Sequence, residues 1–359
     1  MLFENIVIKV DIKIITMTKL RKRSEEIRQF ILANVEKYPK DIATLTAKQF
    51  EITRQAVNKH IQALVEQKSL LVTGSTQSRH YSLQLLEQWE NAYPLSKSLE
   101  EHVVWQADIL PRLGQLPENV IDIWHYGFTE MLNNAIDHSA GNSVVVSLKK
   151  TATAIEIIIS DDGEGIFKKI QRILNLTDER QALLELAKGK LTTDPDNHSG
   201  EGIFFSSKVF DSFWILSGNV FFDHQQEQEV DCIVENDSSV LGTVVSMRLY
   251  NNSQRTTKQI FDSFTDENYS FAKTVVPVRL VQYGHEKLIS RSQAKRLLAR
   301  IERFKIVVFD FEGVEIIGQG FADEIFRVFK KQHPDVELHY VNACKGVKQM
   351  ISRAGFKEI

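Results

Sequence analysis

Apolar residues recur three and four positions apart along the first ninety residues, which is the spacing of helices with one buried face. The stretch SEEIRQFILANVEKY predicts a first helix. A short helix around Thr46 to Phe50, a tight turn at Glu51 and Ile52, and a longer helix from Thr53 are predicted next. The stretch LLVTGSTQSRHYSL predicts two short strands around a Gly-Ser-Thr turn. The predicted buried stripe of the longer helix comprises Ala56, Val57, Ile61 and Leu64.

The middle of the chain, over residues 95–250, combines helical and strand patterns. The stretch from Ser98 to Ser139 is helical apart from a break near Gly114 and Pro117. The apolar run IEIIISD predicts a strand that ends in a glycine-rich turn, and HSGEGIFFSSKVFD predicts a helix opened by a second glycine pair. The stretch LGTVVSMRLY predicts a further strand, so this part is expected to be an α/β domain.

The last part, residues 268–359, alternates β-runs with helices. KTVVPVRLVQ and KIVVFDF predict strands, and ISRSQAKRLLARIERF predicts the helix between them. A short strand and a glycine turn that opens another helix follow Asp310. This alternation predicts an α/β layer fold.

Composition fits a multidomain globular protein. The 359 residues are 43% hydrophobic and 25% charged, which excludes a disordered chain or a coiled-coil rod. The formal net charge of -3 gives no whole-protein attraction to nucleic acid or membrane. Residues 17–82, however, hold 12 Lys or Arg against 6 Asp or Glu, which indicates a nucleic-acid module in this segment.

Cysteine usage and hydropathy exclude several other classes. Cys232 and Cys344 lie far apart with no metal-ligand spacing, so the sequence predicts neither a zinc site nor a disulfide framework. A reducing cytoplasm is expected. No run of about 18 apolar residues exists, and charged residues interrupt the N-terminal stretch, unlike a signal peptide. Met17 is an alternative first residue.

Residues 20–90, with helix, helix, turn, helix and hairpin in that order, resemble a winged helix-turn-helix domain, an α+β fold. The resemblance implies DNA binding through the longer helix, whose polar face has residue types that reach phosphates and base edges. A protein-binding winged helix, or a merely solvated face, explains the same pattern. The predicted DNA-binding residues are Arg54, Gln55, Asn58 and Lys59 on that helix and Arg79 near the tip of the hairpin.

Four short motifs follow one another between residues 130 and 243. They comprise Glu130 and Asn134 on a helix, Asp161, Gly163 and Gly165 after a strand, Gly200 and Gly202 before a helix, and Gly242 and Thr243 before a strand. Each motif alone is common. Their order closely resembles the GHKL ATP-binding domain, a Bergerat-type α/β sandwich shared by histidine kinases, gyrases, heat-shock chaperones and anti-sigma-factor serine kinases.

Glu130 and Asn134 lie one helical turn apart, so both side chains leave the same face and can converge on one ligand. Mg²⁺ prefers oxygen ligands, and a carboxamide supplies one. The resemblance implies ATP and Mg²⁺ as cofactors. It also implies that Asn134 is the metal ligand and that Glu130 is the base that orients a water molecule or an acceptor hydroxyl.

The resemblance gives the remaining motif residues roles in nucleotide binding. Asp161 is expected to accept a hydrogen bond from the adenine amino group, with Thr243 in support. Gly163 and Gly165 are expected to let the backbone pass close to the nucleotide, since neither has a Cβ atom.

The phosphates are expected at the second glycine pair. Gly200 and Gly202 would place backbone N–H groups and a helix N-terminus against them. Residues 166–199 are expected to form a lid over ATP, with Lys188 or Lys190 as a direct phosphate contact.

The stretch VVFDFEGVEIIGQGFADEIF resembles STAS domains such as the anti-sigma-factor antagonists. The antagonists have a phosphorylatable serine at the start of the helix, whereas this sequence has Gly318, Gln319, Gly320 and Phe321. The departure indicates docking by this domain rather than its phosphorylation. Neither His102 nor His125 has the context of a histidine-kinase acceptor.

The leading interpretation is a cytoplasmic three-domain regulator that binds DNA under the control of ATP. One alternative is a protein serine kinase of the anti-sigma type with an external acceptor. Another is an ATPase signalling adaptor whose winged helix binds protein. A protein partner for the STAS-like domain is expected, a homodimer is compatible with the sequence, and no membrane association is expected.

Overall fold

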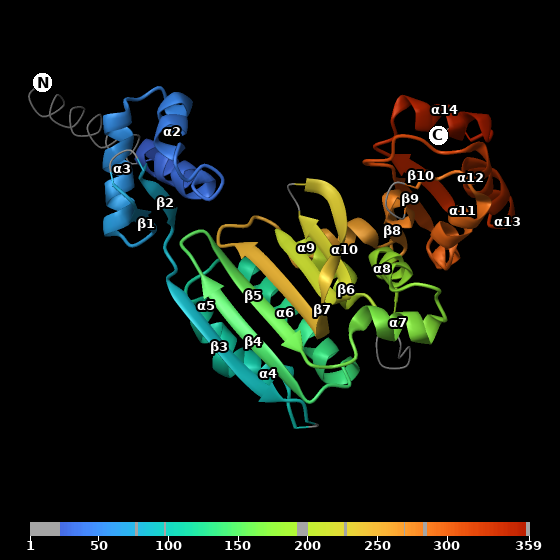
Figure 1. Ribbon diagram of the computed structural model, residues 1–359, viewed down its shortest axis with the longest axis horizontal. Coiled ribbons are helices and arrows are strands. Elements are labelled where there is room, and N and C mark those ends of the chain that lie inside the picture. The colour runs from blue at the N-terminus through green and yellow to red at the C-terminus, as the bar shows by residue number, and fades with distance from the viewer. Residues whose placement is uncertain are drawn as a thin grey trace, which may run out of the picture. The chain divides into compact units, whose positions relative to one another are not determined.

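The structure is a computed structural model that describes residues 22–75, 78–96, 98–191, 200–225, 228–268, 270–282 and 286–356. These residues separate into two compact units (Figure 1). The first unit comprises the chain up to Trp89 together with Leu148–Ile155, and the second comprises the remainder.

Helices and a hairpin make up the first unit. Residues 22–34 are helical, α2 spans Ile42–Phe50 and α3 spans Arg54–Glu66. The strands β1 (Leu70–Thr73) and β2 (His80–Leu83) pair antiparallel. This is the element order that the sequence predicts, and the core of the unit includes Ile27, Ile31, Val35, Val57, Ile61 and Leu64. Ala56, predicted to be buried, is only half-buried.

The turn between α2 and α3 lies where the sequence predicts it. Glu51 has a left-handed backbone with φ 53°, which ends α2. Thr53 caps α3, because its hydroxyl accepts a hydrogen bond from the Ala56 amide at 3.2 Å. α2 begins at Ile42, one turn before the predicted start, and the buried Thr46 hydroxyl donates back to the Ile42 carbonyl.

A five-stranded sheet forms the middle of the chain, with strand order β3-β4-β5-β7-β6. β6 and β7 pair antiparallel, with Ser212 opposite Arg248. The hydrophobic pattern did not predict β3, an edge strand whose sequence EQWENAYP is largely exposed and lacks an apolar alternation. The strands are β3 Glu87–Pro94, β4 Ser143–Lys150, β5 Ala154–Asp161, β6 Ser212–Gln225 and β7 Gln228–Tyr250.

Helices α4, α5 and α6 lie on one face of this sheet (Figure 1). The predicted break is confirmed, since α5 ends at Leu113, directly before Gly114, and α6 begins directly after Pro117. Within α6, Gly127 allows close packing, because a Cβ atom there would lie 2.2 Å from the buried Phe210 ring. The helices are α4 Glu101–Val104, the π-helical η2 Trp105–Ile109, α5 Leu110–Leu113, α6 Glu118–His138, α7 Ile166–Leu174, α8 Glu179–Lys188, α9 Gly202–Val209 and α10 Thr257–Phe264.

The C-terminal part is a three-stranded parallel sheet with helices, as the alternation of patterns predicts. The strand order is β10-β9-β8. The short strand predicted after Asp310 is reduced to a single bridge between Leu288 and Ile317. The elements are β8 Lys273–Pro277, η3 Val278–Val281, α11 Arg291–Leu298, η4 Ile301–Arg303, β9 Ile306–Asp310, α12 Gln319–Asp323, η5 Glu324–Phe329, α13 Lys330–Gln332, β10 Glu337–Val341 and α14 Lys345–Arg353.

One hydrophobic core extends from α8 and α9 into the C-terminal part. Leu184 of α8 and Phe204 and Phe205 of α9 belong to the same buried cluster as Val276 of β8 and Leu297 of α11. The two helices are therefore packed on both the five-stranded sheet and the C-terminal part.

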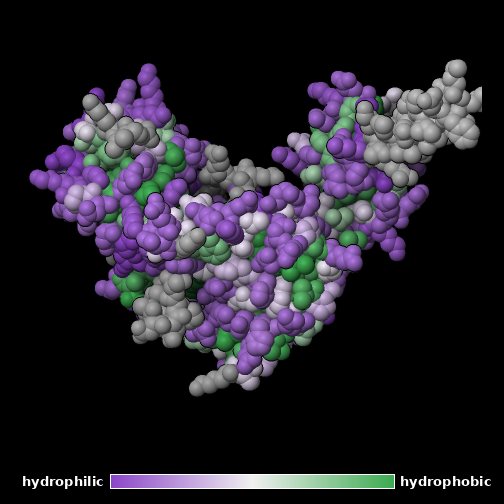
Figure 2. All heavy atoms as spheres, turned by 180° about the vertical axis from the view of Figure 1, so that it is seen from behind, coloured by the Kyte–Doolittle hydropathy of each residue, from purple (hydrophilic) through white to green (hydrophobic). Residues whose placement is uncertain are grey.

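The surface visible in Figure 2 is mostly hydrophilic, with scattered apolar residues. Among the described residues, none of the helices combines the length and the apolar character that a membrane span requires.

Candidate functional site

A cavity of about 280 Å³ opens between α6, the end of β5, α7, α8, the start of α9 and β7. Six of the residues predicted for nucleotide binding line it, although they are spread over more than a hundred positions of the chain. They are Glu130, Asn134, Asp161, Gly200, Gly202 and Thr243. The fold thus brings together four motifs that are far apart in sequence.

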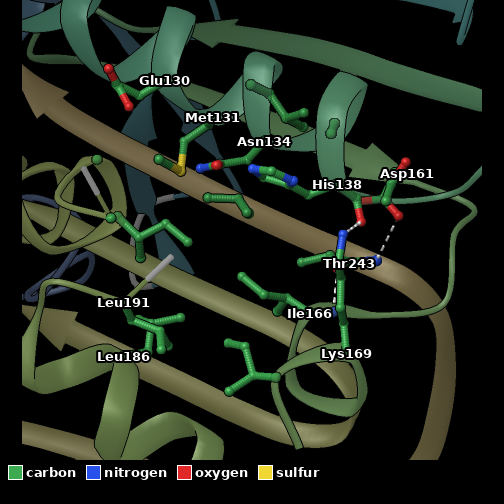
Figure 3. Close-up of a pocket in the computed structure, with 18 of the residues that line it drawn as sticks. Glu130, Met131, Asn134, His138, Asp161, Ile166, Lys169, Leu186, Leu191 and Thr243 are labelled. Carbon is green, nitrogen blue, oxygen red and sulfur yellow. Dashed lines mark hydrogen bonds between the residues drawn. The ribbon is translucent and has the colours of Figure 1, made fainter. Parts of the chain in front are cut away.

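Helix α6 supplies one wall of the cavity. Glu130, Asn134 and His138 follow one another along this helix, and Asp161 lies beyond His138 (Figure 3). The Nδ2 atom of Asn134 is buried and has no hydrogen-bond partner among the described residues. Because an unpaired buried amide is costly, this group is suited to a polar ligand in the cavity.

The Glu130 carboxylate lies against the start of α9. A Cβ atom at Gly202 would be only 2.1 Å from Glu130 Oε2, so any larger residue would displace the carboxylate. The N-terminus of a helix carries partial positive charge and unpaired N–H groups. The structure therefore combines a carboxylate with an anion-favouring helix end at one end of the cavity.

Asp161 ends β5 and is 8% exposed. Its Oδ1 atom accepts hydrogen bonds from the amides of Gly163 at 2.9 Å and Thr243 at 3.3 Å. Burial raises the pKa of Asp161, and the two amide donors offset part of this rise. Because Oδ1 receives both amides, Oδ2 is left to accept a hydrogen bond from a ligand.

Thr243 holds the turn after Asp161 in place. Its hydroxyl oxygen accepts a hydrogen bond from the Ile166 amide at 3.0 Å. Gly242, with φ 73°, approaches so closely that a Cβ atom would lie 2.0 Å from the Asp161 carbonyl oxygen. The Gly-Thr pair is thus required to pack the β7 backbone against the end of β5.

Gly163 and Gly165 do not line the cavity. A Cβ atom on Gly163 would lie 2.0 Å from the Ser139 carbonyl oxygen, and one on Gly165 would lie 2.6 Å from Ser217 Oγ. Contacts within the protein therefore require glycine at both positions, and the approach of this backbone to a nucleotide stays a prediction.

Lys188 and Lys190 do not line the cavity either. Lys188 is fully buried, and its ammonium group donates to Glu185 Oε1 at 2.8 Å and to the Ala299 carbonyl at 2.7 Å. The Lys190 ammonium group donates to the Arg303 carbonyl at 3.2 Å. Leu186 does line the cavity, and two helical positions rotate a side chain by about 200°, so Lys188 faces away from it. Residues 192–199 of the predicted lid lie outside the described residues.

Lys169 lines the cavity and was not predicted. It lies on the cavity face of α7 with Ile166 and Ile170, and its ammonium group donates to the His138 carbonyl at 2.7 Å. Burial lowers the pKa of Lys169. The available signal in the sequence was its spacing from the two isoleucines, three positions after Ile166 and directly before Ile170.

In the first unit, the residues predicted to contact DNA are all exposed. Arg54, Gln55, Asn58 and Lys59 are exposed on α3, where Val57, Ile61 and Leu64 form the buried side, and Arg79 precedes β2. The structure thus leaves this polar face of α3 open to solvent.

A family model described as a STAS-like domain of unknown function matches residues 293–348. The match runs from within α11 to within α14 and includes β9, β10 and the helix α12–α13. The matched residues form a STAS-like domain, and we call the C-terminal part that contains it, residues 268–359, the STAS-like part. None of the curated proteins compared matches the chain. The resemblance stated for residues 268–359 is thereby confirmed for the matched residues of the STAS-like part.

Replacing either of two neighbouring aspartates by the neutral asparagine should change the stability of the protein, in opposite directions for the two positions. The pKa of Asp161 is raised by burial, so its ionised form opposes folding above about pH 4. The pKa of Asp162 is lowered by the amides of Ser143 and Asn142, so its ionised form favours folding over the same range. We expect Asp161→Asn to raise the melting temperature at pH 7 and Asp162→Asn to lower it.

The Asp161→Asn difference should shrink as the pH falls towards about 4, because wild-type Asp161 is then increasingly protonated in the folded state as well as the unfolded state. The Asp162→Asn difference should shrink only at lower pH, because the lowered pKa keeps folded Asp162 ionised near pH 4. Thermal unfolding followed by circular dichroism at pH 7 and pH 4 measures this. A loss of stability in Asp161→Asn at pH 7 would contradict the burial assigned to this carboxylate.

Proposed function

We propose that the cavity binds Mg-ATP and that the protein is a nucleotide-gated regulator that binds DNA through α3. The observation that carries the proposal is Asp161, whose Oδ1 is held by two backbone amides while Oδ2 is left for a donor in the cavity. The exocyclic amino group of adenine is such a donor. The order of the four motifs, which resembles the GHKL domain, supports the same ligand.

The other end of the cavity fits a metal-bound triphosphate. The buried Asn134 carboxamide can supply an oxygen ligand to Mg²⁺, once its amide group is turned to suit. The backbone amides at the start of α9, an eight-residue helix that begins at Gly202, can donate hydrogen bonds to phosphate oxygens. Bound Mg²⁺ would supply positive charge to neutralise those oxygens.

Glu130 favours a second candidate function, transfer of the γ-phosphoryl group to an external serine. Its carboxylate lies beside the proposed phosphate position, against Gly202, where a base could take a proton from a hydroxyl or a water molecule. If the protein neither binds DNA nor transfers phosphate, it would instead be a signalling adaptor.

DNA binding by the first unit is supported by side-chain placement. Arg54, Gln55, Asn58 and Lys59 are exposed on α3, while the opposite side of the helix is buried. A helix with long polar side chains on an open face suits the major groove. A nucleotide-dependent change in the second unit would then regulate DNA binding by the first unit.

Titration calorimetry with Mg-ATP tests the proposed ligand directly. Wild type should bind, and Asp161→Asn should lose binding at least tenfold, because its amide places a donor against the adenine amino group. Asp162→Asn is the matched control, since Asp162 does not line the cavity. A wild type that binds no adenine nucleotide, or equal affinities in the two variants, would overturn the assignment.

Replacing Glu130 distinguishes its role in binding Mg-ATP from its role in phosphate release or transfer. Glu130→Gln keeps the shape of the side chain and removes the proton acceptor, so Mg-ATP should bind while phosphate release or transfer falls roughly 10²-fold or more. Glu118→Gln, at the exposed start of the same helix, serves as the control. If wild type binds Mg-ATP but releases no phosphate above background, Glu130 has no catalytic role.

The DNA-binding face can be tested in the full chain by fluorescence anisotropy. The double change Arg54→Ala and Lys59→Ala should weaken DNA binding and reduce the salt slope by about 2, roughly one for each phosphate contact. The control, Lys37→Ala and Lys40→Ala, removes the same charge from exposed positions outside α3. Equal weakening in both double variants would indicate a general charge effect and no specific role for α3.

A further inference from the structure

Helix α8 has a buried Glu185–Lys188 pair within it, and Arg300 of the STAS-like part contacts this pair. Lys188 and Glu185 are 0% and 3% exposed, and their charged groups lie 2.8 Å apart. The Arg300 guanidinium lies 3.1 Å from the second carboxylate oxygen of Glu185. Charged groups are rarely buried unless they are paired. The contact with Arg300 and the burial of the Glu185–Lys188 pair both depend on α8 and the STAS-like part being in contact.

Hydrogen bonds to the backbone continue the junction. The Lys188 ammonium group donates to the Ala299 carbonyl at 2.7 Å, and the buried Thr274 hydroxyl of β8 donates to the Lys188 carbonyl at 2.7 Å. Each bond joins α8 to a different element of the C-terminal part. The end of α8 is therefore fixed in position from two sides.

The next residues form a reciprocal pair with η4. The Lys190 ammonium group donates to the Arg303 carbonyl at 3.2 Å, and Arg303 Nη1 donates to the Lys190 carbonyl at 2.7 Å. The Lys190 ammonium group also lies 4.9 Å from the centre of the Phe304 ring, within the range of a cation–π interaction. Lys190 has φ 54°, so its left-handed backbone directs the chain from α8 towards the cavity.

The same short segment lines the proposed ATP cavity. Leu186 and Leu191, on either side of Lys188, both face the cavity. Phe204 of α9 lines the cavity and also belongs to the core that α9 shares with the STAS-like part. A displacement of the STAS-like part would therefore move two walls of the cavity.

We propose that the STAS-like part controls nucleotide affinity by holding α8 and residues 189–191 in the position that forms the cavity. This inference rests on the proposed binding of Mg-ATP. The cavity is already formed while the junction is intact, so the junction preorganises the site, and loosening it should weaken binding. Because coupling between two sites is reciprocal, Mg-ATP should in turn tighten the junction. A protein that binds the STAS-like part would act on the nucleotide through α8.

Lys188→Met and Thr274→Val should both weaken the junction, the first strongly and the second slightly. Lys188→Met leaves the Glu185 charge without its lysine, while Thr274→Val removes one hydrogen bond and nearly keeps the side-chain shape. Lys330→Met is the matched control, because Lys330 also donates to backbone carbonyls, at Pro334 and Val336, but lies within the STAS-like part and away from α8. Neither Lys188 nor Thr274 lines the cavity.

Two measurements on the full chain distinguish the possible outcomes. Hydrogen exchange of the α8 amides should be roughly tenfold faster in Lys188→Met, and Mg-ATP should slow it in wild type. Affinity for Mg-ATP, from calorimetry, should fall about tenfold in Lys188→Met and about threefold in Thr274→Val. Lys330→Met should leave both quantities at their wild-type values.

Unchanged Mg-ATP affinity in both junction variants, with wild type binding normally, would overturn the coupling and leave the proposed function intact. A wild type that binds no adenine nucleotide would overturn both. If Lys188→Met fails to fold, Thr274→Val decides the question, since its single hydrogen bond is a small part of the total stability.

Discussion

The position of α9 depends on a cluster of aromatic rings at its inner side. The Phe204 and Phe205 rings lie 4.8 Å and 5.0 Å from the Phe271 ring, which precedes β8, and Phe205 lies 4.2 Å from Phe261 of α10. Aromatic side chains bury large areas and prefer specific geometries, so these contacts restrict the helix strongly. They direct the first turn of α9, at Gly202, towards Glu130. The anion-favouring helix end is thus placed by packing that belongs jointly to the cavity and to the STAS-like part.

The sequence was informative where local chemistry determines the structure. Asp161 could be placed at a strand end because β5 alternates and then runs into glycines, and the polar face of α3 follows from its helical period. The sequence was uninformative where tertiary packing decides which segments become strands and which side chains face the cavity. β3 is an edge strand with little apolar pattern, and the position of Lys169 follows from tertiary contacts, since its ammonium group donates to the His138 carbonyl at the end of α6. Lys188 was expected at the phosphates, since a buried lysine cannot be distinguished from an exposed one until its partners are known.

The missing hydroxyl at the start of α12 has a structural explanation. The Gly318 amide donates to the Leu288 carbonyl at 2.7 Å, and a Cβ atom on Gly318 would lie 2.7 Å from the Ile289 Cα atom. The loop before α11 therefore occupies the space that a side chain at Gly318 would need. A serine at this position would displace the loop or strain the turn. The glycine that replaces the antagonists' serine is therefore required by the packing of this turn.

Two of the predicted phosphate ligands are instead used to join α8 to the STAS-like part, and this changes how the chain can be regulated. A surface lysine would contribute little to stability, whereas Glu185 and Lys188, three positions apart on α8, are buried together and would be exposed to water if the STAS-like part moved away. The Arg300–Glu185 contact and the hydrogen bonds at Ala299 and Thr274 therefore favour the docked arrangement. Since Leu186 lies within the same helix turn as Lys188 and lines the cavity, the docked arrangement is also the one in which the cavity is complete. Regulation of the nucleotide by a partner of the STAS-like part would then need no contact with the nucleotide itself.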